Sequence, residues 1–197
     1  MKKFIDMTDE ELALSYADGN NRAFDLLLQR NQTKLFSYIL FVVHDEDFAN
    51  DIFQETFVKA IVKMKEGRYA STGKFGAWLM RIAHNIIMDN FRQQHTEKIV
   101  DTKDDNNLQN LSENSVLAGN REMDFINEQI LNDIKRLVCQ LPTTQREVIY
   151  MHYYQQMPFK EIADATNVSI NTALGRMRYA IINLRRMVRE HNLMLTA

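Results

Sequence analysis

The sequence predicts an all-α fold of two small helical domains joined by a flexible linker. Only 6 Gly and 2 Pro interrupt the 197 residues, which is fewer breaks than an array of short strands requires. Apolar residues make up 45% of the chain and recur at intervals of three and four residues, the spacing of one helix face. One long polar segment lacks this periodicity and divides the helical pattern into two parts.

The first helix is predicted to run from Asp9 to Asp18. Thr8 and Glu11 have the spacing of a capping box, in which each side chain accepts a hydrogen bond from the other residue's backbone N–H. Gly19 is the residue type that most often follows the last turn of a helix. The start and the stop of this helix are therefore both encoded locally.

Two longer amphipathic helices are predicted next, over about Ala23 to Val42 and Ala49 to Met64. Their apolar residues fall on one stripe over several turns, and the polar segment 44–47 separates them. By pattern alone, the polar face of the second helix is a solvated surface. This face carries Asp51, Gln54, Glu55 and Lys59.

A glycine-rich loop, residues 67–76, precedes a helix predicted from about Phe75 to Arg92. Trp78 lies on the apolar stripe of this helix and is expected to pack in the core, whereas Tyr69 is the expected exposed aromatic residue of the loop. The opposite side of the helix presents polar residues that are roughly aligned because they recur every three or four positions. They are Arg81, Asn85, Asp89 and Arg92.

Polar residues dominate from about residue 95 to residue 120. We therefore predict an N-terminal domain (1–97), a flexible acidic linker (98–124) and a C-terminal domain (125–197). The net charges of these segments are −2, −3 and +3. The basic C-terminal domain favours a polyanionic partner, although its charge is too small for strong DNA binding by electrostatics alone.

The C-terminal domain has a helix-turn-helix pattern. Ala163 allows a second helix to approach closely, Asn167 is a residue type that tolerates a left-handed turn, and Ser169 can cap the helix that follows. The predicted helices of this domain span about residues 125–141, 144–154, 159–166 and 170–188.

The last helix is suited to the major groove of DNA. Polar and arginine side chains near its start can reach base edges, and the later arginines favour contacts with phosphates. An ordinary helical corner with a solvated basic face is the competing interpretation. The residues predicted to contact DNA are Ser169, Asn171, Thr172, Gly175, Arg176, Arg178 and Tyr179.

Nearly the whole chain resembles the extracytoplasmic-function (ECF) group of the sigma-70 family of RNA polymerase sigma factors. Residues 51–59 are similar to the polymerase-binding helix of that family. Residues 75–85, together with Asp89 and Arg92, are similar to its promoter-melting and minus-ten-reading region. The segments that resemble its minus-35-reading region are 141–149, 160–164 and 172–180.

The resemblance implies an alternative sigma factor that binds RNA polymerase core and directs promoter recognition, DNA melting and transcription initiation. The polar face of 51–59 would dock on the coiled coil of the polymerase clamp, and the C-terminal domain would also contact the flap. An anti-sigma factor would hold the protein inactive, at the inner membrane. In the minus-ten region the resemblance implies DNA contacts by Tyr69, Lys74, Arg81, Asn85 and Arg92.

The last helix departs from the family pattern at four positions. Leu174 and Gly175 stand where many relatives carry a basic and a small hydroxyl residue. Tyr179 stands where Arg is frequent, and Asn171 replaces a common Gly. The minus-35 sequence that relatives prefer therefore does not transfer to this chain.

Three other functions fit parts of the sequence. A helix-turn-helix regulator would bind operator DNA without joining the polymerase, but it leaves the N-terminal domain unexplained. An enzyme is disfavoured by the lack of metal-ligand spacing, of a phosphate-binding glycine loop and of a nucleophile motif. We therefore expect no catalytic residue, metal, cofactor or small-molecule substrate. The arginines of the last helix argue against an adaptor that binds only proteins.

The sequence also indicates where the protein works. Cys139 is the single cysteine, so it cannot form an internal disulfide, and a reducing compartment is expected. The N-terminus lacks the apolar core of a signal peptide, and no apolar stretch approaches the roughly 20 residues that span a bilayer. We expect a cytoplasmic protein.

Overall fold

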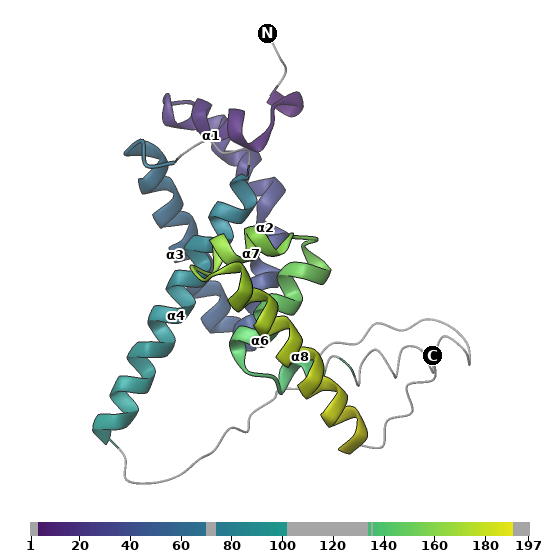
Figure 1. The fold of residues 1–197 in the computed structure, drawn as a ribbon. Helices are drawn as coiled ribbons and strands as arrows, with labels where there is room; N and C mark the ends of the chain where they lie inside the picture. The colour runs from purple at the N-terminus through teal and green to yellow at the C-terminus, as the bar shows by residue number, and fades with distance from the viewer. Residues whose placement is uncertain (1–3, 70–73, 102–133, 135, 191–197) are drawn as a thin grey trace, which may run out of the picture.

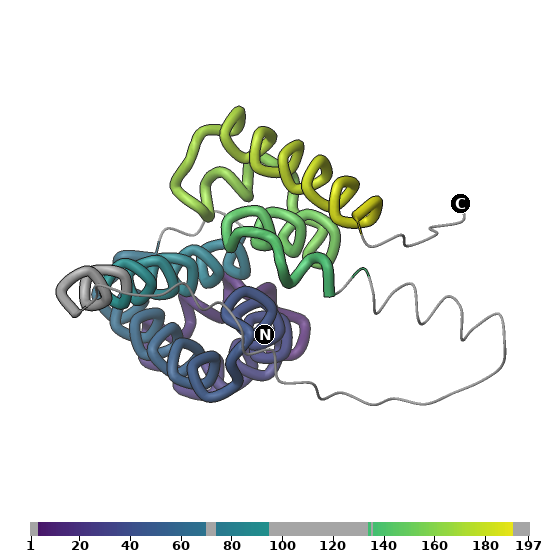
Figure 2. The backbone as a smooth tube through the Cα atoms, turned by 90° about the horizontal axis from the view of Figure 1, so that it is seen from below, coloured from purple at the N-terminus to yellow at the C-terminus, as the bar shows by residue number. Residues whose placement is uncertain are grey.

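The computed structural model describes residues 4–69, 74–101, 134 and 136–190, and over these residues it contains helices and no strand. The helices form two bodies, a larger N-terminal bundle and a C-terminal body that stacks against it (Figures 1 and 2). The predicted fold class, all-α with two helical domains, is confirmed.

The N-terminal bundle is held together by the apolar stripes of its helices. Burial of one large apolar side chain contributes about 1.5–3 kcal/mol, and the least exposed of these side chains come from all four α-helices. They include Leu12, Leu27, Leu35, Tyr38, Ile39, Ile52, Met64, Phe75, Leu79, Ile86 and Ile87. The elements are the 3₁₀ turn η1 (Phe4–Asp6), α1 (Asp9–Ala17), α2 (Asn21–Val43), α3 (Glu46–Lys65) and α4 (Phe75–Asp101).

The predicted signals at the ends of α1 are confirmed. Thr8 N donates to Glu11 Oε2 at 2.9 Å and Glu11 N donates to Thr8 Oγ1 at 3.2 Å, which is the reciprocal capping box. Gly19 adopts φ of 101°, a conformation that favours glycine. Local sequence alone therefore sets both ends of this helix.

Helix α4 is longer than predicted. Its apolar stripe ends near Arg92, but the helix continues to Asp101 and passes through the predicted domain boundary at 97/98. The loss of apolar periodicity marks where a helix leaves the core, whereas polar residues such as Gln and Glu still favour the helical backbone. The rest of the predicted linker, and most of the helix predicted over 125–141, lie outside the described residues.

The C-terminal body contains a feature that the periodicity does not predict. A single helix is predicted over 144–154, but its last five residues form a π-helix in which Gln155 N bonds Tyr150 O at 3.2 Å. Tyr150 and Tyr154 stack with ring centroids 5.1 Å apart. The elements are α6 (Thr143–Ile149), the π-helix η2 (Tyr150–Tyr154), α7 (Phe159–Ala165) and α8 (Ile170–Glu190).

The two bodies meet at two places, where α6 and η2 pack on α2 and where α7 packs on α4. The ring of Tyr150 lies 4.9 Å from that of Phe41. The Arg146 guanidinium donates to Val42 O at 2.8 Å and to Cys139 O at 2.7 Å. Because Val42 is in the last turn of α2, the guanidinium satisfies a carbonyl at the negative end of the helix dipole.

His44 lies at this junction, and its shifted pKa predicts that the stability of the protein depends on pH. Burial, and then the positive charge of Arg146, lower the pKa of His44 to about 4. In the unfolded chain a histidine titrates near about 6.5, so between these values the unfolded state binds a proton that the folded state does not. We expect the free energy of unfolding to fall as the pH drops from about 6.5 to 4.

The variant His44→Asn tests this expectation, because Asn tolerates the positive φ of 59° at this position. Urea unfolding at pH 7.0, 5.5 and 4.5 should show a smaller loss of stability in the variant than in the wild-type protein. Equal losses in the two proteins would mean that His44 does not contribute to the pH dependence.

Candidate nucleic-acid interface

Helices α7 and α8 form a helix-turn-helix. Asn167 adopts φ of 53° in the turn, and Val168 N donates to Ala163 O at 3.0 Å. Ser169 Oγ accepts from Thr172 N at 3.0 Å, so Ser169 caps α8. Ala163 is 2% exposed at the contact between the two helices. The left-handed turn, the cap and the close contact are each as predicted.

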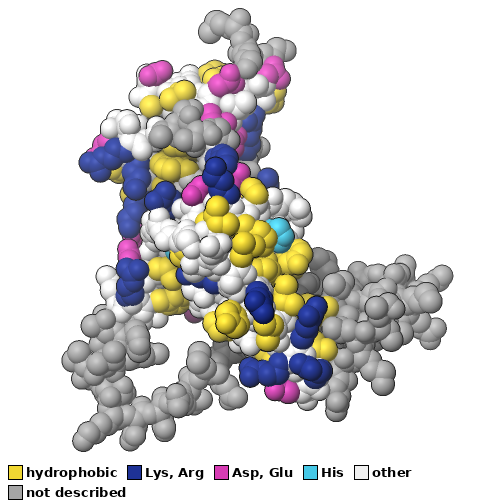
Figure 3. All heavy atoms as spheres, viewed as in Figure 1, with side chains coloured by type: hydrophobic (Ala, Val, Ile, Leu, Met, Phe, Trp, Pro, Cys, Tyr) yellow, Lys and Arg dark blue, Asp and Glu magenta, His cyan; other side chains and the backbone are white. Residues whose placement is uncertain are grey.

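One side of α8 packs into the C-terminal body and the other faces outward. Ala173, Met177 and Ala180 are buried on the inner side. Among the residues predicted to contact DNA, Gly175 and Arg176 are half-buried and the others are exposed. Lys and Arg side chains, dark blue in Figure 3, gather over the C-terminal part of α8. The predicted DNA-contacting residues that are exposed are Ser169, Asn171, Thr172, Arg178 and Tyr179.

Three exposed apolar residues lie among these polar ones. Ile170, Leu174 and Ile182 are 45%, 44% and 45% exposed. They are not assigned to DNA contact from the sequence, but one signal was available. Leu174 and Ile182 lie off the stripe that the buried side chains of α8 define, so the helical period places these two toward solvent. Ile170 lies in line with that stripe and is exposed at the first position of the helix.

The polar face of α3 is exposed in the manner predicted. Asp51, Gln54, Glu55 and Lys59 all face solvent, and Lys59 Nζ lies 2.7 Å from Glu55 Oε1. The structure adds Val58 and Val62, which are 58% and 47% exposed. Positions 51, 55, 58 and 62 recur every three or four residues and so form one stripe. This stripe therefore places acidic and apolar groups side by side on one exposed face.

A basic cleft lies between the two bodies, beside α4 and α7. Its volume is about 690 Å³, and Trp78 and Asn85 are among its lining residues. The acidic residues Glu161 and Asp164 enter it from α7. Arg92 is not part of the cleft lining and lies farther along α4, 3.1 Å from Asp89. The cations of the cleft are Lys63, Arg68, Lys74, Arg81 and Lys160.

The structure corrects the prediction for Tyr69. This residue is only 8% exposed, and its ring packs edge-on against Trp78 at 4.7 Å and Phe75 at 5.6 Å. Its buried hydroxyl has no hydrogen-bond partner among the described residues. The cluster buries Tyr69 because two aromatic side chains of the first turn of α4 fold back over it, which the loop composition does not indicate. Trp78 packs against the core, as predicted.

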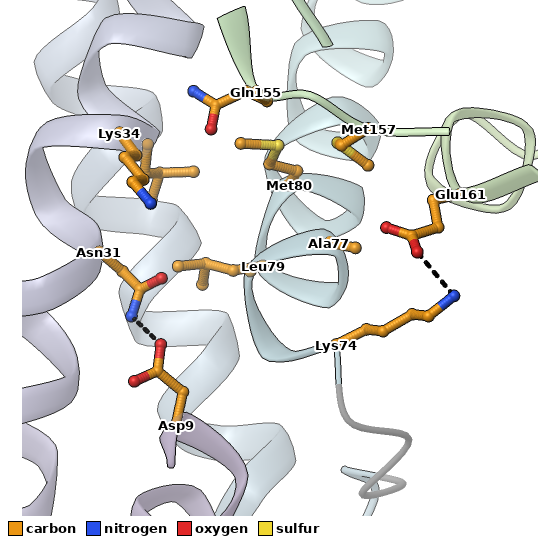
Figure 4. Close-up of a pocket in the computed structure, with 12 residues that line it drawn as sticks. Asp9, Asn31, Lys34, Lys74, Ala77, Leu79, Met80, Gln155, Met157 and Glu161 are labelled. Carbon is orange, nitrogen blue, oxygen red and sulfur yellow. Dashed lines mark hydrogen bonds and ion pairs between the residues drawn. The ribbon is translucent and has the colours of Figure 1, made fainter. Parts of the chain in front are cut away.

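Residues predicted to read the minus-ten element contact the helix-turn-helix directly. Arg81 donates to Asn167 Oδ1 at 2.6 Å, and Asn167 Nδ2 donates to Asn85 Oδ1 at 3.1 Å. Lys74 Nζ lies 2.8 Å from Glu161, and Figure 4 shows this pair bridging the start of α4 and α7. Three of the predicted minus-ten residues, Lys74, Arg81 and Asn85, therefore have partners on the C-terminal body in this arrangement.

A buried polar cluster also joins the two bodies. Glu147 of α6 is fully buried, and its Oε1 accepts a hydrogen bond from Tyr38 OH of α2. His84 Nδ1 of α4 lies 2.6 Å from the same oxygen. Burial, and then the adjacent Glu147, raise the pKa of Tyr38 well above its ordinary value. Separation of the bodies would take these groups from each other and expose them to water.

Two further classes of site were sought in the part of the chain that the structure describes. No group of three or more His, Cys, Asp or Glu side chains is placed there to hold a metal ion. None of the helices described is both long enough and apolar enough to cross a membrane.

The geometry defines a class of protein with two helical modules. One carries a helix-turn-helix with an exposed basic helix, the other carries an exposed stripe of acidic and apolar residues on α3, and a basic cleft lies between them. Family models agree with this division: a sigma-70 region 2 model matches residues 27–97, and a sigma-70 region 4 model matches residues 131–174.

Curated relatives match over most of the chain. The RNA polymerase sigma-H factor of Pseudomonas aeruginosa is 25% identical over 178 residues, which are 86% of this chain and 88% of that protein. The ECF RNA polymerase sigma factor SigW of Bacillus subtilis is 24% identical over 174 residues, 87% of this chain and 92% of that protein. The chain belongs to the ECF group of the sigma-70 family.

Solved structures share the fold. The sigma factor RpoE of Bartonella quintana, in complex with the anti-sigma factor NepR, has a TM-score of 0.67 at 21% identity and covers 84% of this chain and 96% of that one. CnrH, in complex with the cytosolic domain of CnrY, has a TM-score of 0.64 at 24% identity and covers 92% of this chain and 97% of that one. The chain is an alternative sigma factor that directs transcription initiation. The alternative hypothesis, an operator-binding regulator that does not join the polymerase, is not favoured.

Proposed function

We propose a division of labour between three surfaces of this sigma factor. The stripe on α3 docks on the clamp coiled coil of core RNA polymerase. The basic cleft beside α4 captures unpaired minus-ten bases through Arg81 and Asn85, and α8 enters the major groove of the minus-35 element. The observation that carries this proposal is that Arg81 and Asn85 of α4 line a basic cleft, while the C-terminal body presents a capped helix-turn-helix.

Use of both DNA surfaces requires the two bodies to separate. Asn167 of the helix-turn-helix is hydrogen-bonded to Arg81 and Asn85, and Glu161 forms an ion pair with Lys74. These side chains are therefore not available to DNA in the closed arrangement. Since the two promoter elements are separated along the duplex, a closed arrangement cannot reach both. Polymerase contacts on each body would supply the free energy that opens this interface.

The contact with the polymerase flap is proposed for an apolar groove on the C-terminal body. The groove has a volume of about 670 Å³ and lies between the residues around Leu137 and the second half of α8. Ile181, Leu184 and Val188 line it, and apolar walls of this kind suit the apolar side chains of a partner protein. Arg185 and Arg189 also line the groove, whereas none of the residues predicted to reach base edges does, so the flap contact leaves the base-reading residues free.

We also propose an anti-sigma partner and a cytoplasmic location. RpoE is bound to an anti-sigma factor in its solved structure, and CnrH is bound to the cytosolic domain of CnrY. The similarity in fold supports inhibition of this chain by a protein of the same kind, held at the inner membrane. The domain limits 1–97 and 125–197 are proposed as the units that such an inhibitor contacts.

Reconstituted transcription tests the proposal. Purified chain added to core polymerase should give initiation from specific members of a random promoter library, whereas an operator-binding regulator would leave core polymerase unselective. Arg176→Ala should weaken binding of the holoenzyme to a selected promoter by roughly 1–3 kcal/mol, the range for a lost arginine-to-guanine contact. Its affinity for core polymerase should stay close to wild type. Equal losses in both assays would contradict the assignment of α8 to DNA.

A further inference from the structure

Gly175 is a glycine for which the described structure gives no packing reason. It lies inside α8, its φ is not positive, and a Cβ atom built there meets nothing within 4 Å. Glycine in a helix interior costs roughly 0.5–1 kcal/mol relative to alanine. We therefore expect the protein to be more stable with alanine at this position. Packing within the chain does not explain the glycine.

The place of Gly175 on the helix indicates what that reason is. The buried side of α8 is defined by Ala173, Met177 and Ala180, and at about 100° per residue Gly175 falls on the opposite side. Its neighbours three and four positions away are all exposed and form a rim around a bare stretch of backbone. They are Asn171, Thr172, Arg178 and Tyr179.

An apolar pair borders this bare stretch. Leu174 and Ile170 are one helical turn apart, and 44% and 45% of their surfaces are exposed. Leu174 is three and four positions from Asn171 and Arg178, so it lies beside polar groups suited to base edges. Exposed apolar residues are common on protein surfaces, but Leu174 borders the face that would enter the groove.

We propose that Gly175 is the point of closest approach between α8 and the base pairs of the minus-35 element, and that Leu174 contacts the 5-methyl group of a thymine there. The proposal rests on the proposed function, in which α8 enters the major groove. The lack of a side chain lets the helix backbone come closer to the base edges. Thymine alone among the four bases presents a methyl group in that groove, so an apolar side chain can distinguish it.

The variant Gly175→Ala distinguishes this proposal from a role in folding. We expect the substitution to raise the stability of the free protein and to lower the affinity of the holoenzyme for DNA. The thermal midpoint of the free protein should rise by a few degrees. Binding of the holoenzyme to a duplex enriched from a random minus-35 library should weaken roughly five- to tenfold, as for one mismatched base pair. A variant that binds this duplex as tightly as the wild type would overturn the proposal.

Removal of single methyl groups from the DNA tests the role of Leu174. Each thymine of the enriched duplex is replaced in turn by deoxyuridine, which differs only by the 5-methyl group. At one position the wild-type holoenzyme should lose about three- to fourfold in affinity, the value of one buried methyl-sized group. Leu174→Ala should show the weaker affinity on thymine DNA and no further loss with uracil at that position.

A matched control and the remaining outcomes complete the test. Leu14→Ala truncates a leucine of α1 that is 47% exposed, and it should keep full sensitivity to uracil. If Leu174→Ala keeps that sensitivity, Leu174 does not contact the methyl group and the proposal is wrong. If the variant loses core polymerase binding and keeps its affinity for DNA, Leu174 contacts protein and the proposal is wrong as well. If the wild-type holoenzyme shows no promoter selectivity at all, the proposed function fails before this inference is reached.

Discussion

Glu147→Ala is expected to separate the two helical bodies while each remains folded. The substitution leaves Tyr38 OH and His84 without the carboxylate that joins them, and it opens a cavity in a fully buried site. A buried polar group that is left without its hydrogen-bond partner costs about 1–3 kcal/mol, and this substitution leaves two such groups. Small-angle scattering should report a larger radius of gyration, and circular dichroism should report unchanged helix content.

The separation should also release the minus-ten residues. Arg81 and Asn85 lose their contacts with Asn167 once the bodies part, so a labelled single strand with the minus-ten sequence should bind the free variant more tightly than the free wild type. Glu147→Gln retains an oxygen that accepts from Tyr38 and should open less. Glu190→Ala removes an exposed carboxylate of α8 and serves as the control. A compact Glu147→Ala protein would mean that aromatic contacts such as Phe41 with Tyr150 hold the bodies together without the polar cluster.

Asp51→Ala combined with Glu55→Ala should greatly reduce affinity for core polymerase. Both carboxylates are exposed, so their removal should change the stability of the free protein by no more than about 0.5 kcal/mol. Loss of charged partners from an interface costs about 2–5 kcal/mol, which corresponds to a drop of roughly 30-fold or more in affinity. Competition against a labelled sigma factor for core polymerase measures this loss directly.

The double variant Asp18→Ala with Asp25→Ala provides the matched control. It removes two exposed carboxylates from the same helical bundle, away from α3, and produces the same change in net charge. We expect it to bind core polymerase as the wild type does. If the two double variants lose the same affinity, the effect comes from overall charge and α3 is not the docking surface.

The limits of several helices follow from local sequence, because capping and turn signals act within a few residues. The Thr8 and Glu11 capping box, the left-handed Asn167 and the Ser169 cap each depend on neighbours three or four positions away, and each is found as predicted. The exposed face of α3 is also as predicted, since helical periodicity separates inner from outer positions. The assignment of the exposed α3 residues to polymerase came from the resemblance and stays a prediction.

Other features were not predictable from local patterns. The π-helix at 150–154 depends on the fit of its tyrosines against α2, and helix α4 continues after its apolar stripe ends. Tyr69 is buried because two rings of α4 cover it, although its loop composition favoured exposure. In each case a contact between separate elements, or the absence of one, overrides what the local composition favours.

By itself the sequence determined the helical class, the helix-turn-helix and membership of the sigma family, because these depend on spacing along the chain. Only the tertiary structure decided that the helix-turn-helix lies on the minus-ten residues and that Glu147 joins Tyr38 across 109 positions of sequence. The reason is physical: a contact between two bodies depends on the fit of whole surfaces, and no periodicity within either body encodes which surface of the other it will meet.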